Sequence, residues 1–560
     1  MRSETKNGCS ERGSLDNSIS PTDDSINPRQ GSRSYCGRWC YQRQLEYVGE
    51  LSHDTRPMKK PKFLRFKEGT MCEGSSVFDG YRKLVAVGIV VLVVCGACST
   101  QDETASQGVS EETSRLQGQI PLAHQESGRS QQPYMENMRL VGSQDIENRG
   151  ENGNLGWLGD CAYVAGYYGG KDRLAGMAVI DASNPSNPEL VKLYPGTPGT
   201  RESQVEANEA RSLVVVMPFS HQATPYGDPP GPSLLRIYDA SDDCLNPVLV
   251  GTYDFNDGEV PGNIVTHEHR ISDDGKTIYA TALASDRSDP VDALMAIDVT
   301  DPSQPNLIAT WDLSHEPGMP NSGMHDLDLS SDGNRAYTNT YWNIDNVRHQ
   351  GLSILDLSEV QSRQSDPEIR RISSFNWGPP ENFGITHSAQ LIKIKGREYV
   401  IAMDETMGAD ARAPWGWSRI IDVTEEEYPL QISTIRIAAA DEIHAEQTDQ
   451  DGAIYGSHYI GVDDPFNTSL AFFSWYASGL RAWDIRDPYQ PKEIGYYIPG
   501  AKLDTKLAVG SGYPNSKVDY VYSFIRYRPE TGHIWFNSVF GGFHIVELIE
   551  NPLRMSLGGN

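Results

Sequence analysis

The sequence has little positive charge once its first 97 residues are set aside. The whole chain holds 48 Lys and Arg against 76 Asp and Glu, and 15 of the basic and 11 of the acidic residues precede Cys98. Residues 98–560 therefore carry a formal net charge of −32. An acidic body of this kind repels phosphate backbones, so we expect no nucleic-acid partner.

The usual sequence signatures of catalysis are also lacking. The chain contains no Gly-x-Ser-x-Gly nucleophile elbow and no glycine loop typical of phosphate binding. Cysteine is scarce as well, because only Cys98, Cys161 and Cys244 of the eight cysteines lie beyond residue 97. The sequence therefore predicts neither an α/β-hydrolase nor a nucleotide-binding enzyme.

No apolar run is long enough for a comfortable membrane span. The longest candidate, Leu84–Val94, has 11 residues, follows Tyr81-Arg82-Lys83 and ends in Cys95-Gly96-Ala97-Cys98. A basic segment, a short apolar stretch and small residues before a processing point are typical of a secretory signal. We expect residues 71–97 to be this signal, with residues 1–70 as a disordered or mis-assigned extension and translation starting at Met71 or Met58.

The end of the signal resembles a bacterial lipobox, which implies that Cys98 is the lipid-modified N-terminus of the mature protein. Plain secretion and a retained anchor remain alternatives, since Cys95 stands where the lipobox prefers an aliphatic residue. Residues 98–135 begin with a polar, acidic stretch and are expected to form a flexible tether. Ser99 after the cysteine, by resemblance to lipoprotein sorting, implies a bacterial outer membrane or cell surface.

The rest of the chain repeats one phrase: an apolar run, an acidic residue, a polar turn that usually contains proline, and a second apolar run. The successive acidic residues are 58, 59, 58, 66, 62 and 63 positions apart: Asp181, Asp239, Asp298, Asp356, Asp422, Asp484 and Glu547. A period of this size indicates a repeated supersecondary unit. In the third copy, residues 293–312 alternate as a strand should, and Asp301-Pro302 supplies turn chemistry.

A second hairpin precedes each phrase, as in residues 269–280, where Asp274-Gly275 favours a tight reversal. Four strands per repeat are typical of a β-propeller blade. The sequence therefore predicts an all-β fold at residues 136–560, a seven-bladed propeller of four-stranded blades. We expect the segment 136–146 to supply the outermost strand of the last blade, because Leu140-Val141-Gly142 reads like Leu249-Val250-Gly251. A separate N-terminal strand, or closure by residues 553–557, is the alternative.

The phrases VIDASNPSNPELV, IDVTDPSQPNLIATW and WDIRDPYQPKEIGYY resemble those of the LVIVD-repeat β-propeller proteins, a strand ending in an acid followed by Ser or Thr, Asn or Asp, and Pro. The resemblance covers residues 136–550 and implies an exported or surface-attached propeller without a defined activity. Cys161 and Cys244 fall in neighbouring blades and could form a disulfide in an oxidising compartment. Two unpaired thiols are the alternative, because Cys161 lies in an apolar strand.

Histidines recur near the start of the inner strands of four successive blades: His267, His269, His325, His387 and His444. Innermost strands line the channel of a propeller, so these imidazoles would converge there with the carboxylates of Glu268, Asp326 and Glu446. Neutral imidazole suits copper, zinc or iron, which predicts a transition-metal site. The alternative is a structural role, in which the histidines bond to loop backbones at the channel mouth.

Two functions follow from these patterns. The first is a lipid-anchored binding or scaffold module at the cell envelope, with a protein or glycan partner at the loops of one rim. The second is a metal-dependent exported enzyme, for example an oxidase, with the histidine cluster in the channel. Bound metal would separate the two, and neither the substrate nor the oligomeric state follows from the sequence.

Overall fold

The computed structural model contains seven antiparallel sheets, formed by strands that lie between residues 134 and 548. The structure describes residues 115–166, 176–196, 200–219, 232–255, 264–284, 293–313, 316–319, 322–344, 347–377, 385–406, 413–503 and 517–555. The predicted signal (71–97), the extension (1–70) and Cys98 lie outside these ranges. None of the helices in the described ranges is long and apolar enough to cross a membrane.

The first three sheets each consist of four strands in chain order. They are β3 (Asn152–Leu158), β4 (Cys161–Gly166), β5 (Ala178–Asp181) and β6 (Glu189–Leu193); β7 (Arg201–Asn208), β8 (Leu213–Phe219), β9 (Leu234–Asp239) and β10 (Val248–Asp254); and β11 (Ile264–Ile271), β12 (Thr277–Ala284), β13 (Ala293–Asp298) and β14 (Asn306–Asp312).

The fourth and fifth sheets follow the same order. They are β15 (Gly323–Leu329), β16 (Arg335–Ile344), β17 (Val347–Asp356) and β18 (Arg370–Asn376), then β19 (Ile385–Ile394), β20 (Arg397–Glu405), β21 (Ser418–Asp422) and β22 (Leu430–Ile435). A short helix, α2 (Ser358–Gln361), lies between β17 and β18 of the fourth sheet.

The last two sheets recruit strands from the start of the described chain. The sixth consists of β23 (Ile460–Val462), β24 (Leu470–Trp475), β25 (Gly479–Asp484), β26 (Lys492–Ile498) and β1 (Tyr134–Glu136); the seventh consists of β27 (Arg526–Arg528), β28 (His533–Ser538), β29 (Gly542–Leu548) and β2 (Met138–Gln144). The remaining short helices are α1 (Leu122–Ser127), η2 (Arg129–Gln131), η3 (Ile146–Asn148), η5 (Ala438–Ala440), η6 (Glu442–His444), α3 (Ala445–Thr448) and α4 (Pro552–Met555).

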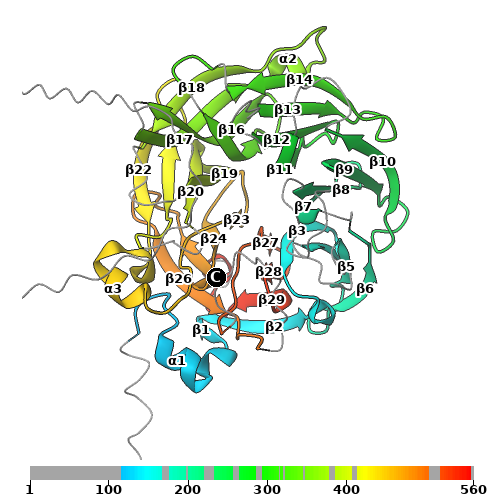
Figure 1. The fold of residues 1–560 in the computed structure, drawn as a ribbon. Helices are drawn as coiled ribbons and strands as arrows, with labels where there is room; N and C mark the ends of the chain where they lie inside the picture. The colour runs from blue at the N-terminus through cyan, green and yellow to red at the C-terminus, as the bar shows by residue number, and fades with distance from the viewer. Residues whose placement is uncertain are drawn as a thin grey trace, which may run out of the picture. The chain divides into compact units, whose positions relative to one another are not determined.

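The sheets are arranged as the blades of a ring, with their first strands innermost (Figure 1). Each inner strand contacts the next one around the ring, from β3 to β7, β11, β15, β19, β23 and β27, and β28 of the seventh sheet contacts β3. The predicted seven-bladed propeller of four-stranded blades is confirmed.

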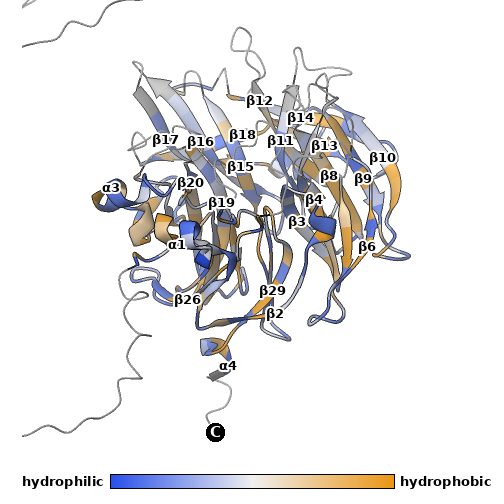
Figure 2. Ribbon diagram, turned by 60° about the horizontal axis from the view of Figure 1, so that its bottom comes forward, coloured by the Kyte–Doolittle hydropathy of each residue, from blue (hydrophilic) through white to orange (hydrophobic). Residues whose placement is uncertain are grey.

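An apolar layer lies between each pair of neighbouring blades. In β8, Val214 and Val216 face the first blade, whereas Val215 and Met217 face the third blade. Seven such clusters of buried residues correspond to the seven interfaces between blades. The alternation follows from the period of two along a strand, and it explains why apolar residues concentrate along the strands in Figure 2.

The recurring aspartate ends the third strand of six blades and shapes the turn that follows. Its carboxylate accepts a hydrogen bond from the backbone N–H two residues on, at 2.8–3.1 Å, in Asp181, Asp239, Asp298, Asp356, Asp422 and Asp484. This is the geometry of an Asx turn. The seventh position, Glu547, instead makes an ion pair with Arg139 of β2 at 2.6 Å.

Residues 138–144 of the segment 136–146 form β2, the outermost strand of the seventh blade, whereas Glu136 ends β1 of the sixth blade. β1 pairs with β26 of the sixth blade, and β2 pairs with β29 of the seventh blade from Met138↔Leu548 to Gln144↔Phe543. Asn137 between them has a φ of 50°, which redirects the chain. Residues 553–555 of the alternative closing segment 553–557 are helical in α4.

The predicted tether is folded in its last part. From Arg115 onward the chain lies on the sixth blade: Ile120 is buried, and the Asp451 carboxylate accepts hydrogen bonds from the Gln119 side chain (2.8 Å) and the Leu122 N–H (2.9 Å). Residues 115–135 therefore belong with the propeller, because they bury apolar and hydrogen-bonding groups against it. Residues 98–114 lie outside the described ranges.

Glycine on the outer strand allows the turn of the next blade to approach. A Cβ atom at Gly251 would lie 1.9 Å from the carbonyl oxygen of Pro302, and one at Gly142 would lie 2.3 Å from that of Pro185. Both glycines follow a β-bulge in their strand. Residues 140–142 and 249–251 are thus similar because each segment makes the same kind of contact, in which a glycine of an outer strand meets the turn of the next blade.

We expect Gly251→Ala to lower the free energy of unfolding by at least 2 kcal/mol, on the order of a core overpacking change, because the backbone of two blades must separate. Thermal unfolding of both proteins measures this. The control is Thr252→Ala, a substitution at the exposed neighbouring residue, which should change the free energy of unfolding by less than about 0.5 kcal/mol. Equal effects of the two substitutions would contradict the docking contact.

The Asx turns also predict a dependence of stability on pH. Hydrogen bonds from Ser241 hold the pKa of Asp239 below its usual range. A lowered folded-state pKa stabilises the protein above the unfolded pKa of about 3.9, and this contribution is lost as the pH falls through the folded value. We expect Asp239→Ala to cost at most about 1 kcal/mol at pH 7, since the group is exposed, and less at pH 3. Urea unfolding at both pH values tests this, and a cost that grows in acid would contradict it.

Candidate metal site in the central channel

The inner strands carry β-bulges where the histidines lie. The register shifts between Thr266 and His269 in β11, between Met324 and Leu327 in β15, and between Thr386 and Ala389 in β19. A bulge sets two consecutive residues against one on the partner strand and redirects their side chains. The bulged pairs are His267-Glu268, His325-Asp326 and His387-Ser388.

Hydroxyl groups of the second strands hold the bulges in place. The Thr281 hydroxyl accepts a hydrogen bond from the Glu268 N–H at 3.0 Å, and the Ser474 hydroxyl accepts one from the Tyr459 N–H at 2.8 Å. The Thr338 hydroxyl donates to the Asp326 carbonyl at 3.0 Å. Backbone groups that the bulge removes from the ladder thus find partners.

Four imidazole rings lie in a row across four successive blades. The ring centroids are 4.4 Å apart between His267 and His325, 3.8 Å between His325 and His387, and 4.1 Å between His387 and His458. His267 is partly exposed, and the other three are buried. The structure therefore brings together three of the predicted histidines and adds His458.

Two of the predicted histidines do not belong to this row. His269 is fully buried beyond the bulge of β11, because the bulge breaks the alternation that would have placed it beside His267. His444 lies in η6, in the segment between β22 and β23, and is partly exposed. His458 occupies the fourth position of the row instead. It stands 26 residues before Asp484 and His444 stands 40 before it, so both depart by five from the 31 to 35 residues of the other three, and spacing alone does not distinguish them.

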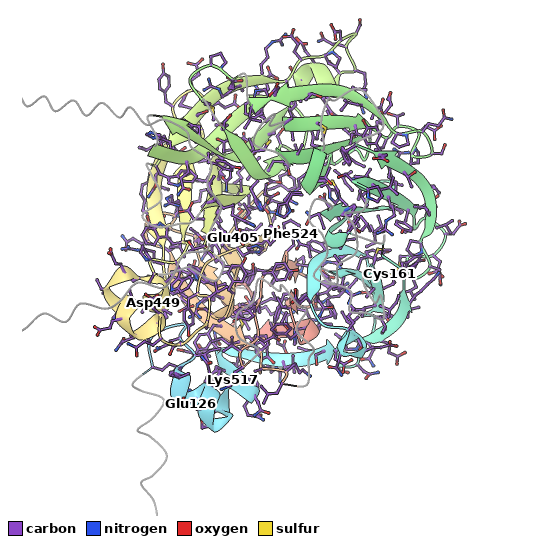
Figure 3. The ribbon with its side chains drawn as sticks, in the orientation of Figure 1. Glu126, Cys161, Glu405, Asp449, Lys517 and Phe524 are labelled. Carbon is purple, nitrogen blue, oxygen red and sulfur yellow. A yellow bond between two sulfur atoms is a disulfide. The ribbon has the colours of Figure 1, made fainter. Side chains whose placement is uncertain are left out.

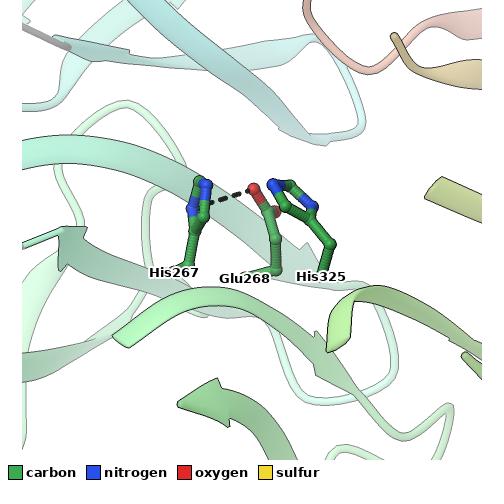
Figure 4. Close-up of side chains that lie close together, drawn as sticks. All are labelled: His267, Glu268 and His325. Atoms are coloured by element: carbon green, nitrogen blue, oxygen red, sulfur yellow. Dashed lines mark ion pairs between the residues drawn. The ribbon is translucent and has the colours of Figure 1, made fainter. Parts of the chain in front are cut away.

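Two carboxylates accompany the rings. Glu268 lies beside His267, with Oε1 at 3.3 Å from Nδ1, as Figure 4 shows together with His325. Glu405, at the end of β20, has Oε1 at 3.2 Å from Nε2 of His458 and Oε2 at 3.6 Å from Nε2 of His387. Figure 3 labels Glu405 near the middle of the ring. Sequence reasoning missed Glu405, because it stands on a second strand and outside any repeated motif.

The other predicted carboxylates do not face the rings. Asp326 makes an ion pair with Arg270, with Oδ2 at 2.9 Å from Nη2. Glu446 is exposed on α3.

Hydrogen bonds fix the tautomers of two histidines. The Nδ1 atom of His387 lies 3.0 Å from the His458 carbonyl oxygen, and the Nδ1 atom of His458 lies 2.6 Å from the Tyr522 carbonyl oxygen. A carbonyl only accepts, so both Nδ1 atoms carry the proton. The Nε2 atoms of both rings then face Glu405. A backbone carbonyl bonded to Nδ1 is typical of metal-binding histidines, because it fixes the orientation of the ring.

The charge states of His325, His387 and Glu405 suit the binding of a cation. Burial and the neighbouring imidazoles hold the pKa values of His325 and His387 well below their usual range, so both rings are neutral at pH 7. Burial alone would raise the pKa of Glu405, but His458 and the Tyr476 hydroxyl keep it below its usual range. Burial and the nearby Asp326 raise the pKa of Glu268 well above normal.

Tyrosine hydroxyls orient both carboxylates. Tyr459 donates to Oε1 of Glu268 at 2.6 Å, and Tyr476 donates to Oε1 of Glu405. Tyr476 has a φ of 23°, an uncommon conformation for a residue other than glycine. Tyr459 also packs against Phe524, with ring centroids 4.4 Å apart and ring planes tilted by 50°.

The channel opens into a cavity of about 420 Å³ farther along the inner strands. Its lining includes Glu206, Arg270, Asp328, Gln390 and Phe524. These polar groups join neighbouring blades: Glu206 accepts from the Ile271 N–H at 3.0 Å, and Asp328 accepts from the Leu391 N–H at 2.6 Å. Burial raises the pKa of Glu206 to about 8 and that of Asp328 to about 6.

The predicted cysteine pair forms a disulfide. Cys161 in β4 is bonded to Cys244 in the turn between β9 and β10, so the bridge joins the first and second blades. Cys161 is buried in the layer between these blades, and Figure 3 shows its place in the ring.

Comparison with known proteins identifies the repeat. The model of the LVIVD repeat matches residues 150–195 and 289–312. The chain is an LVIVD-repeat β-propeller. None of the curated proteins matches the sequence of this LVIVD-repeat propeller.

Several solved structures are similar to the propeller at low identity. A protein from Lactobacillus plantarum is 14% identical over 64% of this chain and 90% of its own, with a TM-score of 0.42. The β-propeller domain of Cps50 (Swd1) from Myceliophteria thermophila is 9% identical over 74% of this chain and 100% of its own, with a TM-score of 0.44. The periplasmic gluconolactonase of Pseudomonas aeruginosa is 11% identical over 74% and 100%, with a TM-score of 0.41.

Proposed function

We propose that this LVIVD-repeat propeller is a binding module of the bacterial cell envelope whose central channel holds a divalent transition-metal ion. One observation carries the metal assignment: the Nε2 atoms of His387 and His458 both face the Glu405 carboxylate, while carbonyl groups occupy their Nδ1 atoms. His325 completes the set, because its ligand atom lies within 4.8 Å of those of His387 and Glu405.

The donor set indicates the kind of metal. Three imidazoles and one carboxylate, without sulfur, suit Zn²⁺, Mn²⁺, Fe²⁺ or Co²⁺ better than a soft ion. The two described cysteines are joined to each other and lie in another blade interface. A structural role for the histidines explains their Nδ1 bonds, but it does not explain why the Nε2 atoms of both His387 and His458 face one carboxylate.

Export and lipid anchoring through Cys98 are the second part of the proposal. The disulfide between Cys161 and Cys244 supports it, because such bonds persist in oxidising compartments. Export to the cell envelope is also supported by the signal-like segment at 71–97, whose end resembles a lipobox. A protein or glycan partner at the loops of one rim is part of this proposal, whereas an oxidase activity would need a substrate site as well.

Metal analysis tests the first part. The untagged protein, stripped with a chelator, reloaded with Zn²⁺ and passed through a gel-filtration column, should retain the ion in stoichiometric amount. His387→Ala and His458→Ala should each weaken retention at least 10-fold, because each removes a ligand. His444→Ala is the matched control and should retain the ion as the parent does. Failure of the parent to retain Zn²⁺, Mn²⁺, Co²⁺, Ni²⁺ or Cu²⁺ would refute the metal site.

Mass spectrometry of the mature N-terminus tests the anchor. We expect a diacylglyceryl-modified Cys98, and Cys98→Ala should release the protein from membranes into the soluble fraction. An unmodified N-terminus at another position would contradict lipid anchoring without affecting the metal site.

A further inference from the structure

We propose that the channel holds a pair of metal ions, with a second ion bound by His267 and Glu268 and with His325 between the two. This inference rests on the proposed metal site at His387, His458 and Glu405. It concerns the other half of the histidine row, which that single ion leaves unexplained.

One buried polar atom in this half has no hydrogen-bond partner in the described part of the chain. It is Oε2 of Glu268, a residue that is 1% exposed. A buried polar group without a partner is costly, and more so if it is charged. Glu268 forms a cluster with His267 and His325 in which one ligand atom of each residue lies within 4.8 Å of the others, so a cation there would give this oxygen a partner.

The two halves of the row repeat the same arrangement. In one half, Glu268 contacts His267 and accepts from the Tyr459 hydroxyl. In the other half, Glu405 contacts His458 and accepts from the Tyr476 hydroxyl. A carboxylate positioned by a tyrosine and facing an imidazole therefore occurs twice. Because the half with Glu405 is the proposed metal site, the same arrangement around Glu268 supports the binding of a second metal ion there.

His325 lies between the two halves of the row, with its ring centroid 4.4 Å from that of His267 and 3.8 Å from that of His387. His325 belongs to both clusters of ligand atoms, those of His267 and Glu268 and those of His387 and Glu405.

The neighbouring acid is excluded as the second carboxylate. Asp326 occupies the position in β15 that corresponds to Glu268 in β11, but its Oδ2 lies 2.9 Å from Nη2 of Arg270. The second ion therefore depends on Glu268. His267, whose side chain is 17% exposed, gives this half its access to solvent.

The number of bound ions tests the proposal. The full mature chain, stripped with a chelator, is titrated with Co²⁺, and the ions retained after gel filtration are counted by elemental analysis. We expect two ions per chain in the parent, one in Glu268→Gln and one in Glu405→Gln. Both substitutions keep the size of the side chain and replace one carboxylate oxygen, a potential metal ligand, with an amide nitrogen. His444→Ala should still retain two.

The spectrum of the bound cobalt gives a second readout. Magnetic coupling between two neighbouring Co²⁺ ions should weaken the electron paramagnetic resonance signal of the second equivalent in the parent, and the signal of Glu268→Gln should be that of an isolated ion. If Glu268→Gln does not fold, judged by circular dichroism, the partly exposed His267→Ala replaces it and should also bind one ion.

The outcomes separate the two proposals. One ion in the parent, unchanged by Glu268→Gln and lost in Glu405→Gln, would overturn the pair and leave the single-ion site standing. No retained ion in the parent would refute the single-ion site and the pair together.

Discussion

The apolar layer between adjacent blades is the constraint on which the other features depend. Every strand in the middle of a blade has neighbours on both faces, so β8 sends Val214 and Val216 to one layer and Val215 and Met217 to the next. The buried polar side chains of the middle strands, such as Thr281 and Thr338, therefore hydrogen-bond to nearby backbone groups. Because β28 packs on β3, the seventh blade contacts the first blade and the ring is closed. The closed ring fixes the positions of the inner strands around the channel.

The bulges of the inner strands turn this rigid frame into a site. A regular strand would send alternate residues into the two flanking layers, where an ionisable group is costly. The bulge directs His267 and Glu268 toward the channel instead, and hydroxyls such as that of Thr281 satisfy the backbone it disturbs. Similar bulges in three successive blades, with His458 in the same row from a fourth, produce a line of imidazoles that no single blade could form.

Much of the fold follows from the sequence because its information is local and repeated. The Asp of each phrase bonds to the N–H two residues on, the proline turn follows, and the period of 58 to 66 residues counts the blades. The glycine shared by residues 140–142 and 249–251 also has a local meaning, since it admits the turn of the next blade. The division of the N-terminal segment between two blades was not predictable, because it depends on Asn137 and on contacts with residues more than 350 positions away.

Only those residues of the candidate site that recur at the same position in successive blades were predictable from the sequence. His267, His325 and His387 share a position in the repeat and do meet, whereas His269 is separated from them by a single bulge. His444 is excluded because the segment between β22 and β23 moves the equivalent position to His458. Glu405 and the two tyrosines reach the rings from other strands. The sequence by itself determined the blade, its turns and their number, because these depend on residues close together in the chain. Only the tertiary structure decided which side chains share the channel, because that depends on strand register, bulges and closure of the ring.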